Sequence, residues 1–547
     1  MAADNDILTR DWQDFERGRS YNRQIDFYDT ADRNERFYAG DQWRGVDAGG
    51  LPTPVFNIIK RVVNYYISSV ASQDVAMTYG CDDMPFLDAG ETALMGRYCR
   101  ILTGHAAMRW EKLRMSSKLR SALLDAALSG DAACYVYWDP VLRGPNGTRG
   151  DFRAAMVDSG SVFYGDPTDD EPQNQPYIII SGRSPAPLLR REAEKNGVGE
   201  ADIAAIIPDG EKELEWGDRA KAEGASDGKC TWLIRLWRDP DDGLIRWRKT
   251  TRGAVIRGEV RTRLTRYPLA MMHWDVRKNC FHGQSPVTGL IPNQLLINKL
   301  YAMVAKHMMD TAFSKVIYDA DLMPDGWNNA VGEAIGINGP PESAVKVLLP
   351  GSMQAGVLEV IRSTMEDTKS LMGATDAALG EVRADNTSAI IAVQRASALP
   401  LESVKRRLYQ FIEDIGLIWL DFMLAYYGER ILAVRDGEGW IKESLPFSRL
   451  KGRLFSCSVD VSPSSYSSEE ATVMTLDNLV KEGIIDPVQY LERLPDGIIP
   501  RRDELVAEIR AGAAGAAAPD IDALIAGGAA GEDYIPGGEP PSGAGGI

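Results

Sequence analysis

The sequence predicts an α+β fold, mainly α, assembled from several compact parts. The strongest indication is an apolar seam whose members recur at alternating spacings of three and four residues, the pattern of a helix packed along one stripe. The seam consists of Leu401, Val404, Leu408, Phe411, Ile415, Ile418, Phe422 and Ala425. Short alternating segments bounded by turn residues add small sheets. A chain of 547 residues also exceeds the size at which one core keeps growing.

Composition and charge limit the classes of function. An apolar content of 44% with 8% aromatic residues is ordinary for a folded chain. The 61 Lys and Arg residues against 78 Asp and Glu give a net charge of −17, the wrong sign for a protein that grips a phosphate backbone. We interpret this charge either as an ordinary acidic surface or as a surface past which a polyanion moves without sticking.

The cysteines and the apolar segments indicate the compartment. Six cysteines are scattered without CxxC or another metal-ligand spacing, and the chain opens MAADNDILTRDW without an apolar leader. We therefore expect assembly in a reducing cytoplasm. The most apolar long segment, residues 415–427, is interrupted by Asp421 and is shorter than the roughly 20 residues of a membrane-spanning helix, so the sequence predicts no membrane contact.

The first 184 residues predict helices followed by strands. Periodic segments at residues 13–38, 57–74 and 113–128 predict helices, and the turn-rich GDQWRGVDAGGLPTP separates the first two. The segments ACYVYWDP, FRAAMVDSGSVFYGDP and PYIIISG predict strands, with PNGT as a hairpin turn.

Residues 185–284 predict two different kinds of structure. Residues 185–228 predict a polar helix with a thin apolar face, and we expect its partner to be another subunit. Residues 229–284 predict strands connected by tight turns, with arginine at 235, 238, 246, 248, 252, 257, 261, 263 and 266. We interpret these arginines either as the solvated face of an antiparallel sheet or as a basic docking edge.

Long helices dominate the next 150 residues. Residues 285–319 predict a helix whose regular part begins near Pro292, because proline is tolerated in a first turn. A further helix is expected at residues 353–371, after a loop and a short strand. A long helix then follows, kinked at Pro400, and residues 386–427 would span on the order of 60 Å.

The end of the chain predicts smaller parts. Short strands are expected at residues 428–460, and two helices at residues 467–510. Residues 511–547 are rich in Gly, Ala and Pro, and we expect them to be disordered.

Motifs of nucleotide and nucleophile chemistry are absent from the sequence. There is no GxxxxGK[ST] and no strand-led GxGxxG, which argues against an ATPase. GASDG at residues 224–228 follows a polar helix and precedes a strand, the reverse of a nucleophile elbow. His105, His273, His282 and His307 share no metal-binding spacing. We expect neither a cofactor nor a catalytic group.

Acidic clusters leave one enzymatic alternative open. They occur at DD (Asp82, Asp83), DPTDDEP (Asp166, Asp169, Asp170, Glu171) and DPDD (Asp239, Asp241, Asp242). None matches a calcium loop, and their settings favour turns. The alternative is a metal-dependent nucleic-acid enzyme that uses the DPTDDEP carboxylates; another is a monomeric scaffold-like protein.

Five segments in a fixed order resemble a known family. They are NRQIDFYDTADRNERFYAGDQW, LRSALLDAALSGDAACYVYWDP, VFYGDPTDDEPQNQPYIIISGRSPAPL, HGQSPVTGLIPNQLLINKLYAMVAKHMMDTAFSKVIYD and LMGATDAALGEVRADNTSAIIAVQRASALPL. In this order the chain resembles the portal, or head-to-tail connector, proteins of tailed bacteriophages. The resemblance covers most of residues 15–510.

The resemblance implies a structural role and a set of partners. Such proteins form a homo-oligomeric ring, usually of twelve subunits, at one capsid vertex of the virion, and double-stranded DNA is packaged and ejected through its channel. The ring would dock a terminase packaging ATPase and later a tail adaptor protein, and contact the major capsid and scaffold proteins. Assembly is expected in the host bacterial cytoplasm, with no enzymatic activity.

The resemblance also assigns parts of the architecture. They are a wing (residues 1–184 and 321–466), a first stem region (185–228), a strand-rich clip (229–284), a second stem helix (285–320), a tunnel loop (373–388), a long kinked helix (388–427) and a helical crown (467–510). The tail at residues 511–547 has no counterpart in the family.

Candidate site residues follow from this assignment. Arg246, Arg248 and Arg257 on the clip strands are candidates for contacts to the motor or the adaptor. The tunnel loop contributes Gly373, Glu381, Arg383, Asp385 and Asn386, of which we expect Arg383 to approach DNA. Small residues among these charges would let the loop bend as DNA passes.

Overall fold

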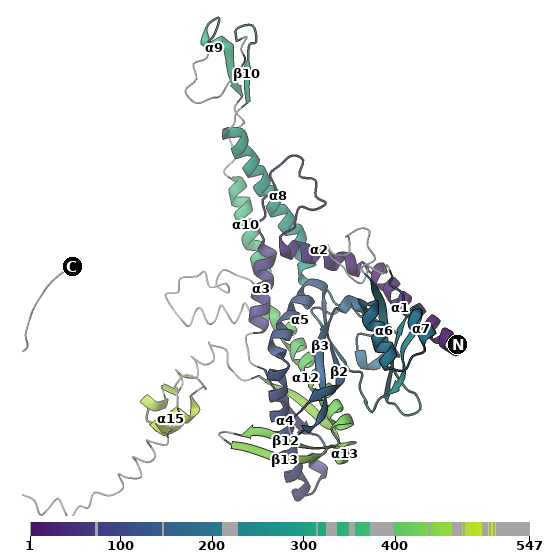
Figure 1. Ribbon diagram of the computed structural model, residues 1–547. Coiled ribbons are helices and arrows are strands. Elements are labelled where there is room, and N and C mark those ends of the chain that lie inside the picture. The colour runs from purple at the N-terminus through teal and green to yellow at the C-terminus, as the bar shows by residue number, and fades with distance from the viewer. Residues whose placement is uncertain are drawn as a thin grey trace, which may run out of the picture. The chain divides into compact units, whose positions relative to one another are not determined.

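The structure is a computed structural model that describes most of the chain (Figure 1). The described residues are 2–71, 75–144, 147–209, 228–312, 315–323, 326, 336–348, 356–371, 399–436, 439–461, 473, 476, 477, 479–494, 502, 505, 506 and 509. They belong to two compact units, Met1–Ser462 and Pro463–Ile547, which are described separately. The chain is mixed α and β, with more helix than strand, in agreement with the predicted class.

Long helices form much of the first unit. They are α1 (Ala2–Gln24), α2 (Phe27–Ala39), α3 (Ile58–Val70), α4 (Ala89–Lys112), α5 (Met115–Ser129), α8 (Pro286–Ala312), α10 (Gly356–Leu371) and α12 (Glu402–Tyr426). The predicted helix at residues 13–38 is two helices, because Asp26 adopts a left-handed conformation with φ of 55° between them. Helix α4 was not predicted.

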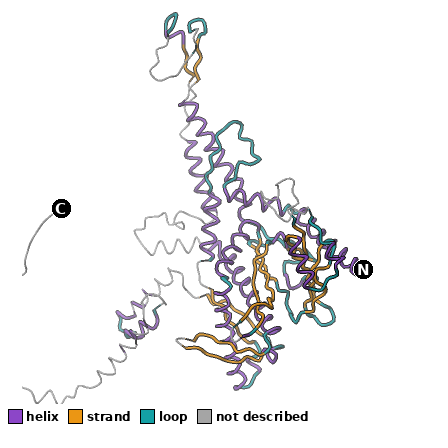
Figure 2. The backbone as a smooth tube through the Cα atoms, viewed as in Figure 1, coloured by secondary structure: helices purple, strands orange, loops and turns teal. Residues whose placement is uncertain are grey.

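The strands form small antiparallel sheets beside the long helices (Figure 2). A five-stranded sheet has the order β4 (Val162–Tyr164), β5 (Tyr177–Pro185), β6 (Lys229–Arg238), β7 (Ile245–Thr251), β8 (Val255–Arg261). A three-stranded sheet has the order β3 (Arg149–Val157), β2 (Asp131–Arg143), β9 (Leu269–His273). Two-stranded sheets pair β1 (Val75–Cys81) with β14 (Phe455–Val461), β10 (Lys315–Tyr318) with β11 (Val345–Leu348) and β12 (Glu429–Asp436) with β13 (Gly439–Pro446).

The five-stranded sheet crosses two predicted boundaries. Strand β5 pairs with β6 along its length, from Tyr177 opposite Trp237 to Pro185 opposite Lys229. Residues 229–261 therefore continue a sheet that begins at residue 162, which argues against a separate clip at 229–284.

Residues 186–204 also belong to this sheet. Helices α6 (Ala186–Lys195) and α7 (Glu200–Ala204) carry apolar residues that pack against β6 and β8 in one buried cluster. Its members are Ala186, Leu189, Ala193, Ile206, Cys230, Ala254 and Ile256. For residues 186–206 the prediction that this face awaits another subunit was wrong, because the chain's own sheet covers it. Residues 210–227 of the same predicted region lie outside the described residues.

Helix α12 lies in the main core. All eight members of the predicted seam are buried, as is Trp419, and the helix packs against β9 and β14. Pro400 lies in the 3-10 turn Leu399–Leu401 that precedes the helix. The predicted upstream arm at residues 388–398 lies outside the described residues.

Helix α8 differs from its prediction at both ends. It begins at Pro286, with Pro292 inside it. Ser285 explains the early start, because its Oγ accepts a hydrogen bond from Val287 N at 3.1 Å. The helix ends at Ala312, and β10 follows where the helix was predicted to continue to residue 319.

The second unit contains a short helix and a small apolar cluster. Helix α15 (Pro487–Arg493) begins with a capping box in which Asp486 and Gln489 satisfy each other's backbone N–H groups. The buried cluster consists of Leu476, Leu491, Leu494 and Val506. Across both units, the helices within the described ranges include none with the length and apolar character to cross a bilayer.

Candidate functional site

Helices α8 and α10 form a two-helix shaft that carries β10 and β11 (Figure 1). The helices lie side by side, with Asn293 Nδ2 donating to Thr368 Oγ1 at 3.3 Å and Tyr301 OH contacting Met365 Sδ at 3.7 Å. The described residues 315–348 between the helices form the tip. Strands β10 and β11 pair there from Lys315 to Tyr318.

Buried amide side chains anchor the shaft to the first unit. Gln294 Oε1 accepts from Ile58 N at 2.9 Å, and its Nε2 donates to Phe56 O at 2.6 Å. Asn298 Nδ2 donates to Gln42 Oε1 at 2.6 Å. Asn298 Oδ1 also accepts from Phe56 N at 3.3 Å. Because Gln294 and Asn298 satisfy backbone groups next to the start of α3, they set the position of α8 against that helix.

A buried polar joint lies where the chain enters α8. It consists of Asp131 at the start of β2, His273 at the end of β9 and His282. Asp131 Oδ1 lies 2.7 Å from His273 Nδ1, and Oδ2 lies 2.6 Å from His282 Nδ1. Gly283 N donates to Asp131 Oδ1 at 2.7 Å. We call these three side chains the His–Asp joint.

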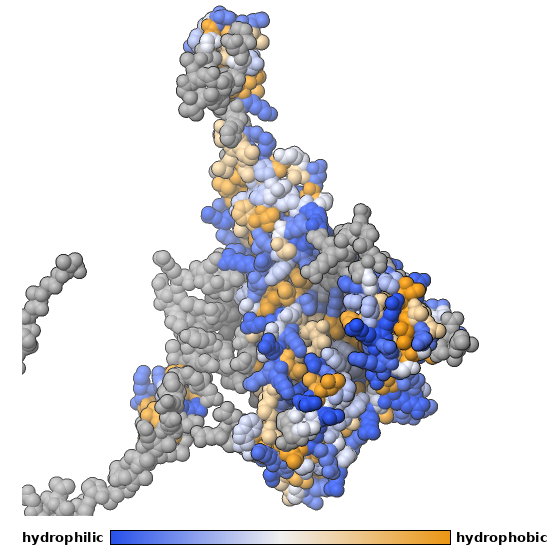
Figure 3. Space-filling view, in the orientation of Figure 1, coloured by the Kyte–Doolittle hydropathy of each residue, from blue (hydrophilic) through white to orange (hydrophobic). Residues whose placement is uncertain are grey.

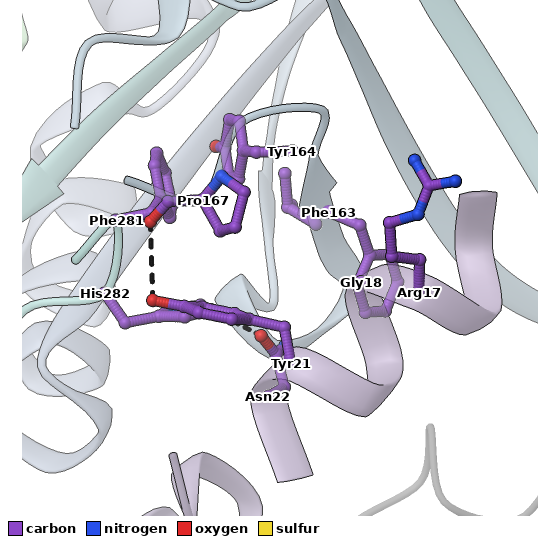
Figure 4. Close-up of a pocket in the computed structure, with 10 residues that line it drawn as sticks. Arg17, Gly18, Tyr21, Asn22, Phe163, Tyr164, Pro167, Phe281 and His282 are labelled. Carbon is purple, nitrogen blue, oxygen red and sulfur yellow. Dashed lines mark hydrogen bonds between the residues drawn. The ribbon is translucent and has the colours of Figure 1, made fainter. Parts of the chain in front are cut away.

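The His–Asp joint also holds α1. His282 Nε2 lies 2.9 Å from Asn22 Oδ1, beside a cavity of about 30 Å³ (Figure 4). Tyr21 OH donates to Pro167 O across this cavity at 3.3 Å. The joint therefore connects α1, β2 and β9 with the segment that leads into the shaft.

The electrostatics of the joint favour an ionised Asp131 paired with a protonated His273. Burial alone would raise the pKa of Asp131, but the hydrogen bonds from His273 and His282 outweigh burial and hold that pKa well below its usual range. Burial opposes protonation of His273, but its hydrogen bond to Asp131 outweighs burial and raises its pKa. Sequence analysis found no metal-binding spacing among the histidines, and it did not show this joint, because 142 residues separate Asp131 from His273.

Apolar side chains remain exposed along the shaft and the tip (Figure 3). They are Leu296, Met303, Met308 and Met309 on α8, Leu358 and Val360 on α10, and Ile317, Tyr318, Val347 and Leu348 on the tip. Exposed apolar residues gathered on neighbouring elements are typical of protein–protein contacts.

The predicted arginine sites separate into two kinds. Arg246 pairs with Asp239 and, at 2.7 Å, with Glu259; Arg248 Nε lies 2.6 Å from Asp11 Oδ2 on α1. Their side chains are only 15% and 13% exposed.

Both arginines hold parts of the chain together, which argues against docking contacts at these positions. Arg257 stays exposed, 5.0 Å from the centre of the Trp247 ring.

The predicted tunnel-loop residues lie outside the described residues. They are Gly373, Glu381, Arg383, Asp385 and Asn386. Their predicted contact with DNA stays a prediction.

The DPTDDEP carboxylates hold turns. Asp166 Oδ1 accepts from Thr168 N at 2.9 Å, Asp169 Oδ1 accepts from Glu171 N at 2.9 Å, and Glu171 Oε1 accepts from Gln173 N at 3.3 Å. The part of the chain that the structure describes contains no group of three or more His, Cys, Asp or Glu residues placed to hold a metal ion. These contacts favour the turn interpretation over the metal-dependent enzyme.

Comparison with known proteins decides the family. The family model of the phage P22-like portal protein matches residues 200–524, more than half of the chain. The chain belongs to the P22-like portal protein family. The match confirms the resemblance found in the sequence, and it includes the shaft, the tip and α12. A search of curated proteins found no match.

Membership of the portal family defines the general role. P22-like portal proteins are structural, and the protein is therefore a structural phage protein of the capsid vertex. The tip is the feature that sequence reasoning missed. Sequence analysis expected one short strand before residue 353 and extended the preceding helix over KVIY, so it did not predict the pair of strands formed by KVIY and VKVL.

Proposed function

We propose that the protein forms a ring-shaped channel, of about twelve subunits, through which double-stranded DNA is packaged and ejected. The observation that supports this proposal is the shaft of a portal-family chain with apolar side chains left exposed along α8 and α10. Burial of such side chains between copies would stabilise a ring, at about 25 cal/mol per Å² of apolar surface.

In this ring α8 and α10 act as the stem, and the tip acts as the clip. The tip has exposed Ile317, Tyr318 and Val347, which supports docking of the packaging ATPase and later of a tail adaptor there. This proposal replaces the predicted stem and clip at residues 185–284.

The charges of the shaft suit a moving polyanion. Cations and anions are mixed, and Lys306 Nζ pairs with Asp310 Oδ1 at 2.8 Å. Each uncompensated cation that contacts a phosphate tightens binding and makes it salt-sensitive, so a mixed shaft lets DNA slide. We propose that residues 373–388, with Arg383, make the closest contact to DNA, a proposal that rests on the sequence.

The test is the mass and shape of the purified full-length chain. Native mass spectrometry should give a closed assembly of about twelve 60.1 kDa chains, and negative-stain images should show a central hole. A chain that stays a 60.1 kDa monomer at high concentration would overturn the proposal.

A further inference from the structure

Phe86 is presented to solvent by a rigid turn. It is 89% exposed, the largest value among the large apolar side chains within the described residues. It ends the 3-10 turn Met84–Phe86 between β1 and α4. Asp82 N donates to Leu454 O at 2.9 Å, and Leu454 N donates to Asp83 Oδ2 at 2.9 Å. The ring of Phe86 is therefore held out from the surface by a fixed backbone.

The surroundings of Phe86 are acidic and apolar. Leu454, whose backbone forms hydrogen bonds with the same turn, is 65% exposed. The acidic residues are Asp82, Asp83, Asp88 and Glu91, and the nearby cation is Arg453, which precedes Leu454 and lies 3.9 Å from Glu91. We call residues 82–88 with Leu454 the Phe86 turn. A preformed aromatic knob is the kind of side chain that carries binding energy at interfaces.

An open aromatic cleft lies elsewhere in the first unit. It has a volume of about 730 Å³ and separates one face of β6–β8 from β2 and β3, with the end of α12 at its base. Its aromatic lining is Tyr135, Tyr137, Trp138, Trp232, Trp247, Phe422 and Tyr426. The volume is that of a site which encloses a ligand of several side chains, and it is far larger than the voids of a packed interior.

Two cations, Lys249 and Arg257, and two carboxylates, Asp158 and Glu192, line the cleft beside its aromatic rings. Lys249 and Arg257 lie opposite each other on β7 and β8. Lys249 Nζ pairs with Glu192 at 2.7 Å and lies 4.9 Å from the Trp232 ring centre.

The two cations differ in their partners. The other lining carboxylate, Asp158, accepts a hydrogen bond from Gly160 N at 2.9 Å. No described carboxylate forms an ion pair with Arg257, whereas Lys249 opposite it is paired with Glu192. An acidic group entering beside Arg257 would give it an ion-pair partner.

We propose that the Phe86 turn of one copy docks in the aromatic cleft of the next copy. The knob is apolar and acidic, and the cleft is aromatic and offers Arg257 as a cation that has no ion pair among the described residues. Within one chain Phe86 stays exposed and does not line the cleft, so the two surfaces meet only between copies. Because the two surfaces differ, the contact is head-to-tail and repeats around a ring. This inference rests on the proposed ring and identifies one of its contacts.

The first experiment compares two aspartate variants of the full-length chain. Phe86→Asp should raise the concentration needed for assembly by about 30-fold or more, the range of an interface hot spot. Val141→Asp is the matched control, because Val141 is 83% exposed and lies outside both surfaces. It should assemble like the wild type. Mass photometry over a concentration series measures both.

The second experiment is a double-mutant cycle of Phe86→Ala and Arg257→Ala. Both side chains are exposed, so neither change should unfold the chain. If the residues meet across an interface, their effects on assembly will be non-additive.

The outcomes separate the inference from the ring proposal. If the wild type forms rings but the effects of Phe86→Ala and Arg257→Ala are additive, the inference is overturned and the ring proposal stands. The same holds if Phe86→Asp and Val141→Asp assemble equally well. A wild-type chain that does not assemble would overturn both.

Discussion

Asp131 and His282 form a contact of 2.6 Å in the interior of the first unit, four residues before α8 begins. Both side chains are almost fully buried. The same carboxylate also accepts hydrogen bonds from His273 and from Gly283 N. One carboxylate thus holds the end of β9 and the segment that leads into the shaft, and the stability of that junction depends on protonation.

We predict that the folded chain loses stability as pH rises above neutrality. Pairing with Asp131 raises the pKa of His273 above its usual value of about 6.5. A raised folded-state pKa adds stability that is complete below about pH 6.5 and is lost as pH rises through the folded value. The unfolding temperature should therefore fall between pH 6 and pH 9, and His273→Gln should flatten the fall. An unchanged slope in that variant would contradict the prediction.

At acidic pH the dependence of stability on pH has the opposite sign, because there stability is lost as pH falls. The depressed pKa of Asp131 contributes stability above its unfolded value of about 3.9, and this stability is lost as pH falls through the lower folded value. Asp131→Asn should lower the free energy of unfolding by about 3–5 kcal/mol, because it removes one partner of a buried pair. Asp241→Asn, at an exposed position, should change it by less than about 0.5 kcal/mol. Chemical denaturation of both variants measures the difference.

Gln294 offers a test of how the shaft is anchored. Gln294→Leu keeps an apolar volume but leaves Ile58 N and Phe56 O without their side-chain partners. We expect a loss of about 1–3 kcal/mol in the free energy of unfolding. Lys299→Leu, on the exposed side of the same helix, is the control. Equal stability of the two variants would show that the amide does not anchor α8.

The parts that sequence analysis predicted well are those whose signal is local. The seam from Leu401 to Ala425 is buried in α12 as expected, because three-four periodicity directly reports one packed helix face. Strands β2, β3 and β5 were likewise visible as alternating segments.

The parts that were missed depend on contacts between distant residues. The pairing of Pro185 with Lys229 joins β5 to β6 across more than 40 residues, and no local pattern shows such a pairing. The His–Asp joint is of the same kind. Arg246 and Arg248 looked like a docking edge because the sequence does not show that Asp239 and Asp11 lie beside them.

The exposed methionines of α8 provide a prediction for assembly. Met303 is 48% exposed on the shaft, so burial of its remaining surface between copies would contribute about half of the roughly 1.5–3 kcal/mol of a full side-chain burial. Met303→Glu should therefore weaken assembly at least tenfold, since it would place a charge in that contact. Val141→Glu is the matched exposed control, and mass photometry gives both midpoints. Assembly of both variants at the wild-type concentration would exclude this face from the contact.

Two glycines inside α4 should respond to alanine with opposite signs. A Cβ at Gly104 would overlap Val434 Cγ1, whereas a Cβ at Gly96 would meet no atom within 4 Å. Glycine within a helix costs about 0.5–1 kcal/mol relative to alanine, so Gly96→Ala should stabilise the fold by up to that amount. Gly104→Ala should destabilise it by about 1–3 kcal/mol, because β12 packs closely against α4 at this point. These glycines also explain why α4 escaped prediction, since they lower its helix propensity. Thermal unfolding of the two variants measures both changes in stability. Stabilisation by both substitutions would mean that β12 does not pack on α4 at Gly104.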